Sequence, residues 1–189
     1  MILLLLILIL IAAGLLAWIA GKRNPLVARY FSIAAIISDF IIVMALFFRY
    51  NSPGNNGWMV EFSANWIPRL GIGIHLALDG LSLIMLLLTF FIGILAVLVS
   101  WKEITVNTGF FHFNILLILS GIAGVFLSVD LFLFYFFWEV MLVPMYFIIA
   151  IWGHEDRIYA SYKFFIFTQA GGLLMFLAIL GLYLIHGHL

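Results

Sequence analysis

One stretch decides how the rest of the sequence is interpreted: Trp138-Glu139-Val140-Met141-Leu142-Val143-Pro144-Met145-Tyr146. It lies within an apolar run, Leu131 to Ile151, that is roughly 20 residues long, which is enough to cross a bilayer. Glu139 is the only acidic residue of that run. A carboxylate at such depth costs about 2.5–3.5 kcal/mol on insertion scales, so a functional site is the working hypothesis. We therefore interpret the remaining chain as a scaffold that holds Glu139 inside a membrane.

The composition is that of an integral membrane protein. Of the 189 residues, 67% are hydrophobic and 8% are charged, whereas soluble domains carry about 25% charged residues. The formal net charge is +0, so no basic surface for nucleic acid is expected. The sequence has no cysteine, which excludes disulfides, thiolate metal sites and cysteine-ligated iron–sulfur clusters, and its histidines are dispersed. We expect no cofactor, metal or redox centre in this chain.

Hydrophobic runs predict about six transmembrane helices in a single domain, 1–189. The helices are expected near residues 1–20, 30–48, 80–100, 112–129, 131–152 and 163–185. Residues 49–79 form a long polar connection between the second and third helices. Large aliphatic side chains alternate from Gly71 to Leu78, which is strand periodicity, so a β-hairpin with residues 58–66 is expected on the outer face.

The fourth and fifth predicted helices should form a close antiparallel pair. Ser120, Gly124 and Ser128 recur at steps of four, which gives one face small side chains and lets a neighbouring helix approach. Asp130 leaves almost no loop before the next helix.

Positive charges predict the orientation of the helices. Most Lys and Arg residues fall on one side of the membrane, and the positive-inside rule places that side in the cytoplasm. The N-terminus then lies outside. The cytoplasmic group comprises Lys22, Arg23, Arg29, Lys102, Arg157 and Lys163, and the external group comprises Arg49 and Arg69.

The neighbours of Glu139 suit proton transfer. On a helix, Tyr135 lies one turn before Glu139 and Tyr146 lies two turns after it, on the same stripe. Pro144 has no amide hydrogen, so the carbonyl of Val140 must bond to water, a hydroxyl or another helix. We interpret Glu139 as a proton relay that Pro144, Tyr135 and Tyr146 support. The alternative is a neutral glutamic acid that bonds to a neighbouring helix and serves packing alone.

Other polar residues allow two interpretations each. Asp39, near the middle of the second helix, is either a polar helix contact or a second site. Asp79 precedes the third helix, where an N-cap is the simplest role. Lys163 either extends its amine to the interface or passes protons inward. Thr168 and Gln169 either bond to a neighbouring helix or line a water path.

Several motifs resemble a known family. They are Trp66-Ile67-Pro68-Arg69 up to His75, Leu78-Asp79-Gly80-Leu81-Ser82, Ser100-Trp101-Lys102-Glu103, Gly109-Phe110-Phe111-His112, Phe132 to Tyr146, and Lys163-Phe164-Phe165. Together they resemble the N-terminal part of subunit M, an antiporter-like membrane-arm subunit of bacterial respiratory complex I (NADH–quinone oxidoreductase). The resemblance covers nearly the whole chain, and the run from Trp138-Glu139 to Pro144-Met145-Tyr146 is its most specific part.

The resemblance implies an all-α polytopic membrane fold, the start of an antiporter-like architecture of about fourteen helices in two inverted repeats, each with a proton path. It also implies that Glu139 pairs with a lysine on a seventh helix. Because about six helices are expected here, the antiporter-like domain is expected to be incomplete.

By this resemblance the chain is a proton-translocating subunit of NADH–quinone oxidoreductase, a translocase that couples quinone reduction elsewhere in the complex to proton movement through Glu139. Its expected partners are other membrane-arm subunits and the lipid bilayer, with no nucleic acid and no soluble substrate. The expected location is the bacterial inner membrane. The alternatives are a subunit of an Mrp-type cation/proton antiporter or of a membrane hydrogenase, which share the glutamate, and a non-catalytic membrane scaffold.

Overall fold

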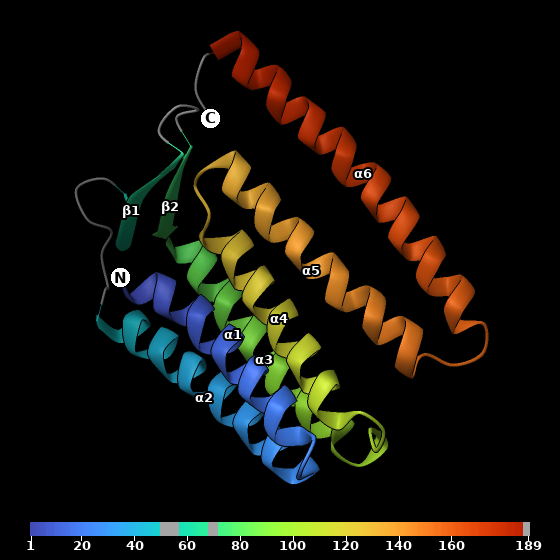
Figure 1. The fold of residues 1–189 in the computed structure, drawn as a ribbon. Helices are drawn as coiled ribbons and strands as arrows, with labels where there is room; N and C mark the ends of the chain where they lie inside the picture. The colour runs from blue at the N-terminus through green and yellow to red at the C-terminus, as the bar shows by residue number, and fades with distance from the viewer. Residues whose placement is uncertain (50–56, 68–71, 187–189) are drawn as a thin grey trace.

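The computed structural model describes residues 1–49, 57–67 and 72–186. Within these residues it contains six helices that are long and apolar enough to cross a membrane, and one two-stranded antiparallel sheet (Figure 1). In chain order the elements are α1 (Ile2–Gly21), α2 (Pro25–Arg49), β1 (Val60–Ile67), β2 (Ile72–Leu78), α3 (Gly80–Glu103), α4 (Thr108–Leu127), α5 (Leu131–Trp152) and α6 (Arg157–His186). The predicted helical membrane fold with a hairpin is confirmed. Arg69, which counted toward the predicted orientation, lies outside the described residues.

Three helices begin earlier than the hydrophobic runs predict. Helix α2 begins at Pro25 rather than near residue 30, α4 at Thr108 rather than near 112, and α6 at Arg157 rather than near 163. The apolar runs mark only the part that lies in hydrocarbon, whereas a helix can continue into its polar flanks. Pro25 suits the first turn of α2 because the first amides of a helix have no intrahelical partner.

Acidic N-caps begin two helices at the end of the bundle that carries the hairpin. The Asp79 carboxylate accepts a hydrogen bond from the Ser82 amide at 2.7 Å at the start of α3, which confirms the predicted N-cap. Asp130 accepts from the amides of Phe132 and Leu133 at 2.8 and 3.1 Å at the start of α5. Each carboxylate satisfies amides that would otherwise lack partners.

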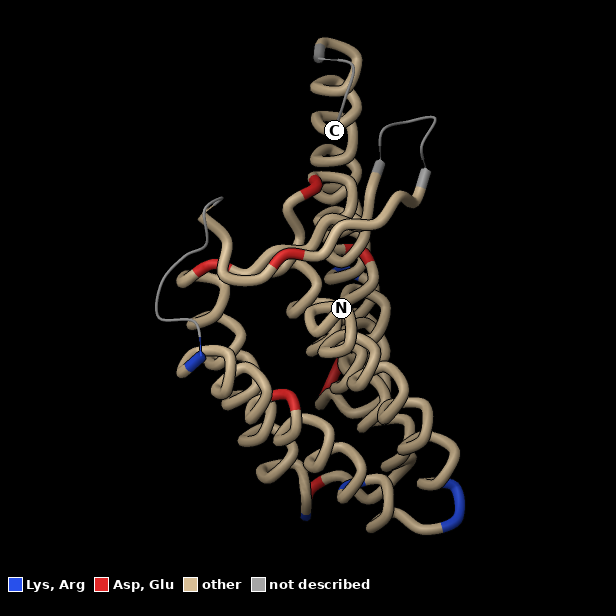
Figure 2. The backbone as a smooth tube through the Cα atoms, turned by 90° about the vertical axis from the view of Figure 1, so that its left-hand side faces the viewer, with Lys and Arg blue, Asp and Glu red and all other residues tan. Residues whose placement is uncertain are grey.

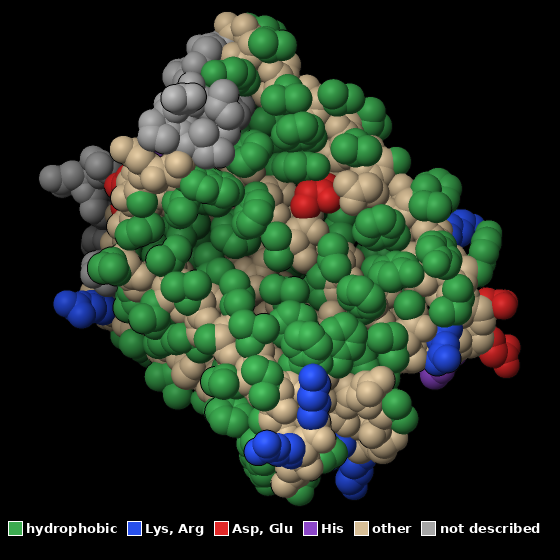
Figure 3. All heavy atoms as spheres, viewed as in Figure 1, with side chains coloured by type: hydrophobic (Ala, Val, Ile, Leu, Met, Phe, Trp, Pro, Cys, Tyr) green, Lys and Arg blue, Asp and Glu red, His purple; other side chains and the backbone are tan. Residues whose placement is uncertain are grey.

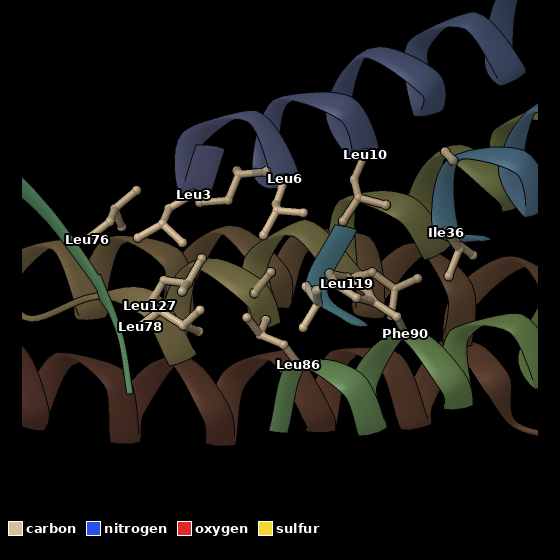
Figure 4. Packing of buried hydrophobic residues seen from close by; sticks show 14 of the residues in the cluster. Leu3, Leu6, Leu10, Ile36, Leu76, Leu78, Leu86, Phe90, Leu119 and Leu127 are labelled. Atoms are coloured by element: carbon tan, nitrogen blue, oxygen red, sulfur yellow. The ribbon is translucent and has the colours of Figure 1, made fainter. Parts of the chain in front are cut away.

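Helices α1 to α4 form the main core of the molecule. Leu6 and Leu10 of α1, Ile36 of α2, Phe90 of α3 and Leu119 of α4 point toward one another between the helices (Figure 4). All five side chains are buried. Apolar contact therefore joins four helices whose outer faces remain exposed to lipid.

Glycines set the spacing of α1 and α4 near the ends of these helices that lie away from the hairpin. A Cβ atom placed on Gly109 would lie 2.8 Å from the carbonyl oxygen of Ala17, and one placed on Gly21 would lie 2.5 Å from the Cα of Gly109. Both obstacles are backbone atoms and cannot rotate away. The absence of side chains at Gly21 and Gly109 is therefore required for this contact.

The hairpin lies across the ends of the helices and is bonded to them (Figure 1). Its register pairs Val60 with Leu78 and Ser63 with His75. The amide of Val129, in the turn between α4 and α5, donates to the carbonyl of His75 at 3.0 Å.

At the opposite end of α5, the indole nitrogen of Trp152 donates to the carbonyl of Val106 at 2.9 Å.

Helices α5 and α6 form an antiparallel pair at one side of the four-helix bundle, with α6 outermost (Figure 1). The small face predicted on α4 lies against α5, because a Cβ on Gly124 would overlap the ring of Phe137. Helix α6 packs mainly on α5. Large apolar side chains along α6, among them Phe167, Leu174 and Leu184, are exposed.

Replacing Gly109 with Val should destabilise the contact between α1 and α4. We expect the free energy of unfolding to fall by about 1–3 kcal/mol, the usual cost of overpacking, because the new atoms meet backbone. Unfolding of the protein in lipid bicelles, followed by circular dichroism, measures the change. Gly171→Ala is the matched control, since a Cβ at Gly171 meets nothing within 4 Å. Equal stability of the two variants would contradict the assigned contact.

Candidate functional site

The carboxyl group of Glu139 lies at the interface of α5 and α6. Its side chain is half-buried on α5, and a Cβ atom placed on Gly172 of α6 would overlap its Oε1 atom. The missing side chain of Gly172 therefore makes the notch that the carboxyl occupies. Oε1 is buried and has no hydrogen-bond partner among the described residues.

Aromatic contacts on both sides of Glu139 fix the register of α5 and α6. The ring of Tyr135 stacks on that of Phe176, with centroids 5.0 Å apart. The ring of Tyr146 meets that of Phe165 edge-on at 5.6 Å. Since the helices are antiparallel, these contacts place Glu139 opposite Gly172, between the two phenols.

Tyr135 and Pro144 also bear on the chemistry of this site. The Tyr135 hydroxyl interacts electrostatically with the Glu139 carboxyl, so a neutral hydrogen-bonding group lies within its reach. Helix α5 continues through Pro144, which is buried. Proline still removes the amide that the carbonyl of Val140 would use, and this gap lies next to Glu139 along the chain.

The predicted supporting residues of α6 lie at different places. Gln169 is half-buried one turn before Gly172, whereas the Thr168 hydroxyl donates to the carbonyl of Phe164 at 2.7 Å. Lys163 is exposed, with its amine 5.7 Å from the centroid of the Tyr159 ring. From Lys163 to Gly172 the helix rises about 14 Å, so this lysine is no ion-pair partner of Glu139.

Asp39 and Asp79 lie apart from Glu139. Asp79 caps α3 at the hairpin end. Asp39 is fully buried in the bundle of α1 to α4, and both of its carboxyl oxygens lack partners in the part of the chain that the structure describes. The structure thus brings Tyr135 and Glu139 together. Tyr146 lies two turns farther along α5, where its hydroxyl interacts with Tyr162 and Ser161, and the two aspartates lie elsewhere.

The sequence analysis gave no role to His112 of α4. This side chain is fully buried, and neither ring nitrogen has a partner among the described residues. The available signal was an ionisable group at the edge of an apolar run. The apolar run predicts a helix that starts near His112, whereas α4 begins one turn earlier and buries its first turn as well.

The surface around the α5–α6 pair is suited to lipid or to further helices. Hydrophobic side chains cover most of the face in Figure 3. An acidic side chain lies among them, and the side chains of Lys and Arg lie toward the edges of the face. Figure 2 shows most Lys and Arg positions at the ends of the helices away from the hairpin and acidic positions also along the helices. A carboxyl thus lies between charged ends in otherwise apolar surroundings.

The chain is similar to membrane subunits of respiratory and antiporter complexes. Residues 128–189 match the family described as NADH:quinone oxidoreductase/Mrp antiporter, TM. NADH-quinone oxidoreductase subunit M of Pseudomonas aeruginosa is 51% identical over 191 residues, which cover 94% of this chain and 37% of that protein. The chain therefore spans little more than a third of that relative.

Solved structures show the same fold. A chain of respiratory complex I from Thermus thermophilus with bound NADH superposes with a TM-score of 0.84 at 29% identity, over 98% of this chain and 36% of that one. A chain of the Mrp complex from Dietzia sp. DQ12-45-1b gives a TM-score of 0.83 at 17% identity, over 100% of this chain and 20% of that one. The motifs around Glu139, the six-helix fold and these similarities agree, and the chain belongs to the NADH:quinone oxidoreductase/Mrp antiporter membrane family.

Proposed function

We propose that this chain is a proton-translocating membrane component of NADH–quinone oxidoreductase. In the assembled complex, quinone reduction elsewhere drives proton movement through Glu139. The observation that carries the proposal is the position of the Glu139 carboxyl at the Gly172 notch. Its Oε1 atom is buried and has no hydrogen-bond partner within the described part of the chain. The similarity to subunit M of Pseudomonas aeruginosa supports the choice of complex.

The relay works by changing which form of Glu139 is favoured. A cation that approaches the carboxyl attracts the carboxylate form, and its withdrawal removes that attraction. Taking up one proton converts carboxylate to acid, and releasing it reverses the step. Tyr135 offers a hydroxyl group next to Glu139, and the hydroxyl of Tyr146 lies two turns farther along α5. The described parts of α5 and α6 place no cation next to Glu139, so a further helix supplies it.

The rest of the assembly is part of the same proposal. The exposed apolar face of α6 receives further membrane-arm helices, and the notch at Gly172 brings Glu139 close to that face. The multi-pass chain lies in the bacterial inner membrane with its Lys- and Arg-rich end in the cytoplasm and its N-terminus outside. This chain carries no redox centre, and electron transfer belongs to other subunits.

An Mrp-type cation/proton antiporter is the second candidate, because the Dietzia Mrp chain shares the fold. The same carboxyl would then exchange protons for sodium. Proton movement that depends on NADH oxidation and is indifferent to sodium favours the respiratory function. Proton movement that requires sodium and no electron donor favours the antiporter.

Replacing Glu139 with Gln should abolish most proton pumping. The amide keeps the shape of the side chain and cannot carry the proton, so we expect pumping to fall by about 10²-fold or more. Inverted membrane vesicles with a pH-sensitive dye measure it, and NADH oxidation with an artificial acceptor should be unchanged. Glu155→Gln, in the exposed turn before α6, is the control. Full pumping in the Glu139 variant would favour a scaffold role.

Two adjacent glycines allow a test of the notch. A methyl group at Gly172 displaces the carboxyl, whereas one at Gly171 meets nothing within 4 Å. We expect Gly172→Ala to lower pumping by about 10- to 100-fold, as small misplacements of reacting groups do, and Gly171→Ala to leave it unchanged. The same vesicle assay applies. Equal pumping by both variants would show that the contact between Glu139 and Gly172 is irrelevant to function.

Replacing Pro144 with Ala should impair pumping less than Glu139→Gln does. Alanine restores an amide to the carbonyl of Val140 and removes a polar gap, while the proton carrier remains. Pumping per NADH oxidised is the measurement. A larger loss than in Glu139→Gln would mean that the interrupted helix, rather than the acid, is the critical feature.

A further inference from the structure

A second set of buried polar groups lies inside the bundle of α1 to α4, away from Glu139. Asp39 of α2 and His112 of α4 are fully buried. Among the described residues, neither oxygen of Asp39 and neither ring nitrogen of His112 has a hydrogen-bond partner. Burial of such groups without partners is costly and rare in folded proteins, so their presence calls for a role.

The order of these groups follows from the direction of the helices. Helices α2 and α4 both start at the Lys- and Arg-rich end of the bundle. Arg29 lies one turn after the start of α2 and His112 one turn after the start of α4, and the charge of Arg29 acts on His112. Asp39 lies deeper along α2 than Arg29 by a rise of about 15 Å. His112 is thus near the basic end, and Asp39 is near mid-membrane.

Helices α2, α3 and α4 meet at the depth of Asp39. A Cβ on Gly93 of α3 would lie 2.8 Å from Leu119 of α4 and 3.5 Å from Ile36 of α2. Figure 4 shows Ile36 and Leu119 close together in this region. Asp39 follows Ile36 by one turn, so it lies at the junction of the three helices.

Buried polar side chains line the same junction. Ser32 of α2 donates to the carbonyl of Ala28 at 2.9 Å, and Thr89 of α3 donates to the carbonyl of Met85 at 2.7 Å. Both side chains are buried. Ser32 lies two turns before Asp39 on the same face of α2, and Thr89 lies one turn before Gly93 on α3. Each bond uses a donor group, and the side-chain oxygen can still accept a hydrogen bond. Oxygen acceptors are therefore spaced along the junction between the depth of His112 and that of Asp39.

A pocket lies at the basic end of the bundle, beside the first turn of α4. It has a volume of about 350 Å³, and Lys22, Asn107 and Thr108 are among its lining residues. Thr108 lies one turn before His112 on the buried face of α4. The carbonyl of Ile104 accepts from Arg29 at 3.0 Å and from Thr108 at 3.4 Å, which ties the pocket wall to the turn that carries His112.

We propose that Asp39 is a second proton-binding site, which exchanges protons with the basic end of the bundle through His112. The imidazole takes a proton from water at the basic end of the bundle on one ring nitrogen and releases one from the other. Water held by the hydroxyl oxygens of Ser32 and Thr89 passes it to the Asp39 carboxylate, which becomes the neutral acid. Release follows the same steps in reverse.

The charges around Asp39 fit such an exchange. The helices packed against α2 are α1, α3 and α4. Helix α1 has no titratable side chain, α3 has only Lys102 and Glu103 in its last turn, and α4 has only His112. On α2 itself, Arg29, Tyr30 and Arg49 lie toward its ends. Among the described residues no cation is placed beside Asp39. The positive charge of Arg29 opposes the protonated imidazole through which the exchange passes, so Arg29 limits the exchange rate.

Infrared spectroscopy of the assembled complex in native membranes tests the proposal. The carboxyl C=O band of Asp39 is identified as the band lost in Asp39→Asn, and its shift after transfer to D₂O gives the exchange rate. We expect His112→Gln to slow this exchange by about 10²-fold, the contribution of a single acid–base group. His154→Gln, at the same end but exposed, and Ser38→Ala, beside Asp39, are matched controls that should leave the rate unchanged.

Arg29→Gln provides a second measurement that leaves His112 in place. Removing the repelling charge should make the exchange faster, whereas a purely structural role for His112 predicts no change. The proposal is overturned if Asp39→Asn removes no exchangeable carboxyl band, or if the rate in Arg29→Gln or in an assembled His112→Gln complex equals that of the unchanged protein. Glu139→Gln should leave the Asp39 band and its rate intact, so the two sites are tested separately.

Discussion

The structure depends on the cost of placing polar groups where water is scarce. Within the hydrocarbon region each amide, carbonyl and ionisable side chain must be satisfied by the protein itself or by an internal path for water. Helices meet this demand for the backbone. The side chains of Glu139, Asp39 and His112 do not meet it within the described residues. In a chain that is so largely apolar, these exceptions are the positions on which the proposed proton chemistry rests.

The bundle of α1 to α4 and the α5–α6 pair differ in how they surround their buried polar side chains. In the bundle of α1 to α4, polar side chains are enclosed by apolar contacts such as those of Ile36, Phe90 and Leu119. In the α5–α6 pair, Glu139 lies close to the outer face of the molecule, where one helix layer separates it from lipid or from a partner. In our proposals the enclosed site therefore binds a proton within the bundle itself, whereas the outer one depends on the helix that packs against α6.

Much of the fold could be predicted from the sequence, because a membrane restricts a chain to few solutions. Apolar runs predicted the six helices, and alternation from Gly71 to Leu78 predicted the hairpin strand. The position of Asp79 before an apolar run predicted the N-cap of α3. The stripe of Tyr135, Glu139 and Tyr146 followed from helical spacing. The notch at Gly172 could not be predicted, since it depends on the register of two helices. The burial of His112 was missed because residues outside hydrocarbon can still be helical and enclosed.

The bonds at the two ends of α5 have a mechanical consequence. Near its start, the Val129 amide bonds to the hairpin, and at its end the Trp152 indole bonds to the carbonyl of Val106. Because both ends of α5 are held by hydrogen bonds, the helix cannot slide or tilt freely. It can change shape only by bending in its middle. Pro144 removes a backbone hydrogen bond near the middle of α5 and so makes bending easier there. A lateral force on α5 would therefore displace the segment that carries Glu139 sideways.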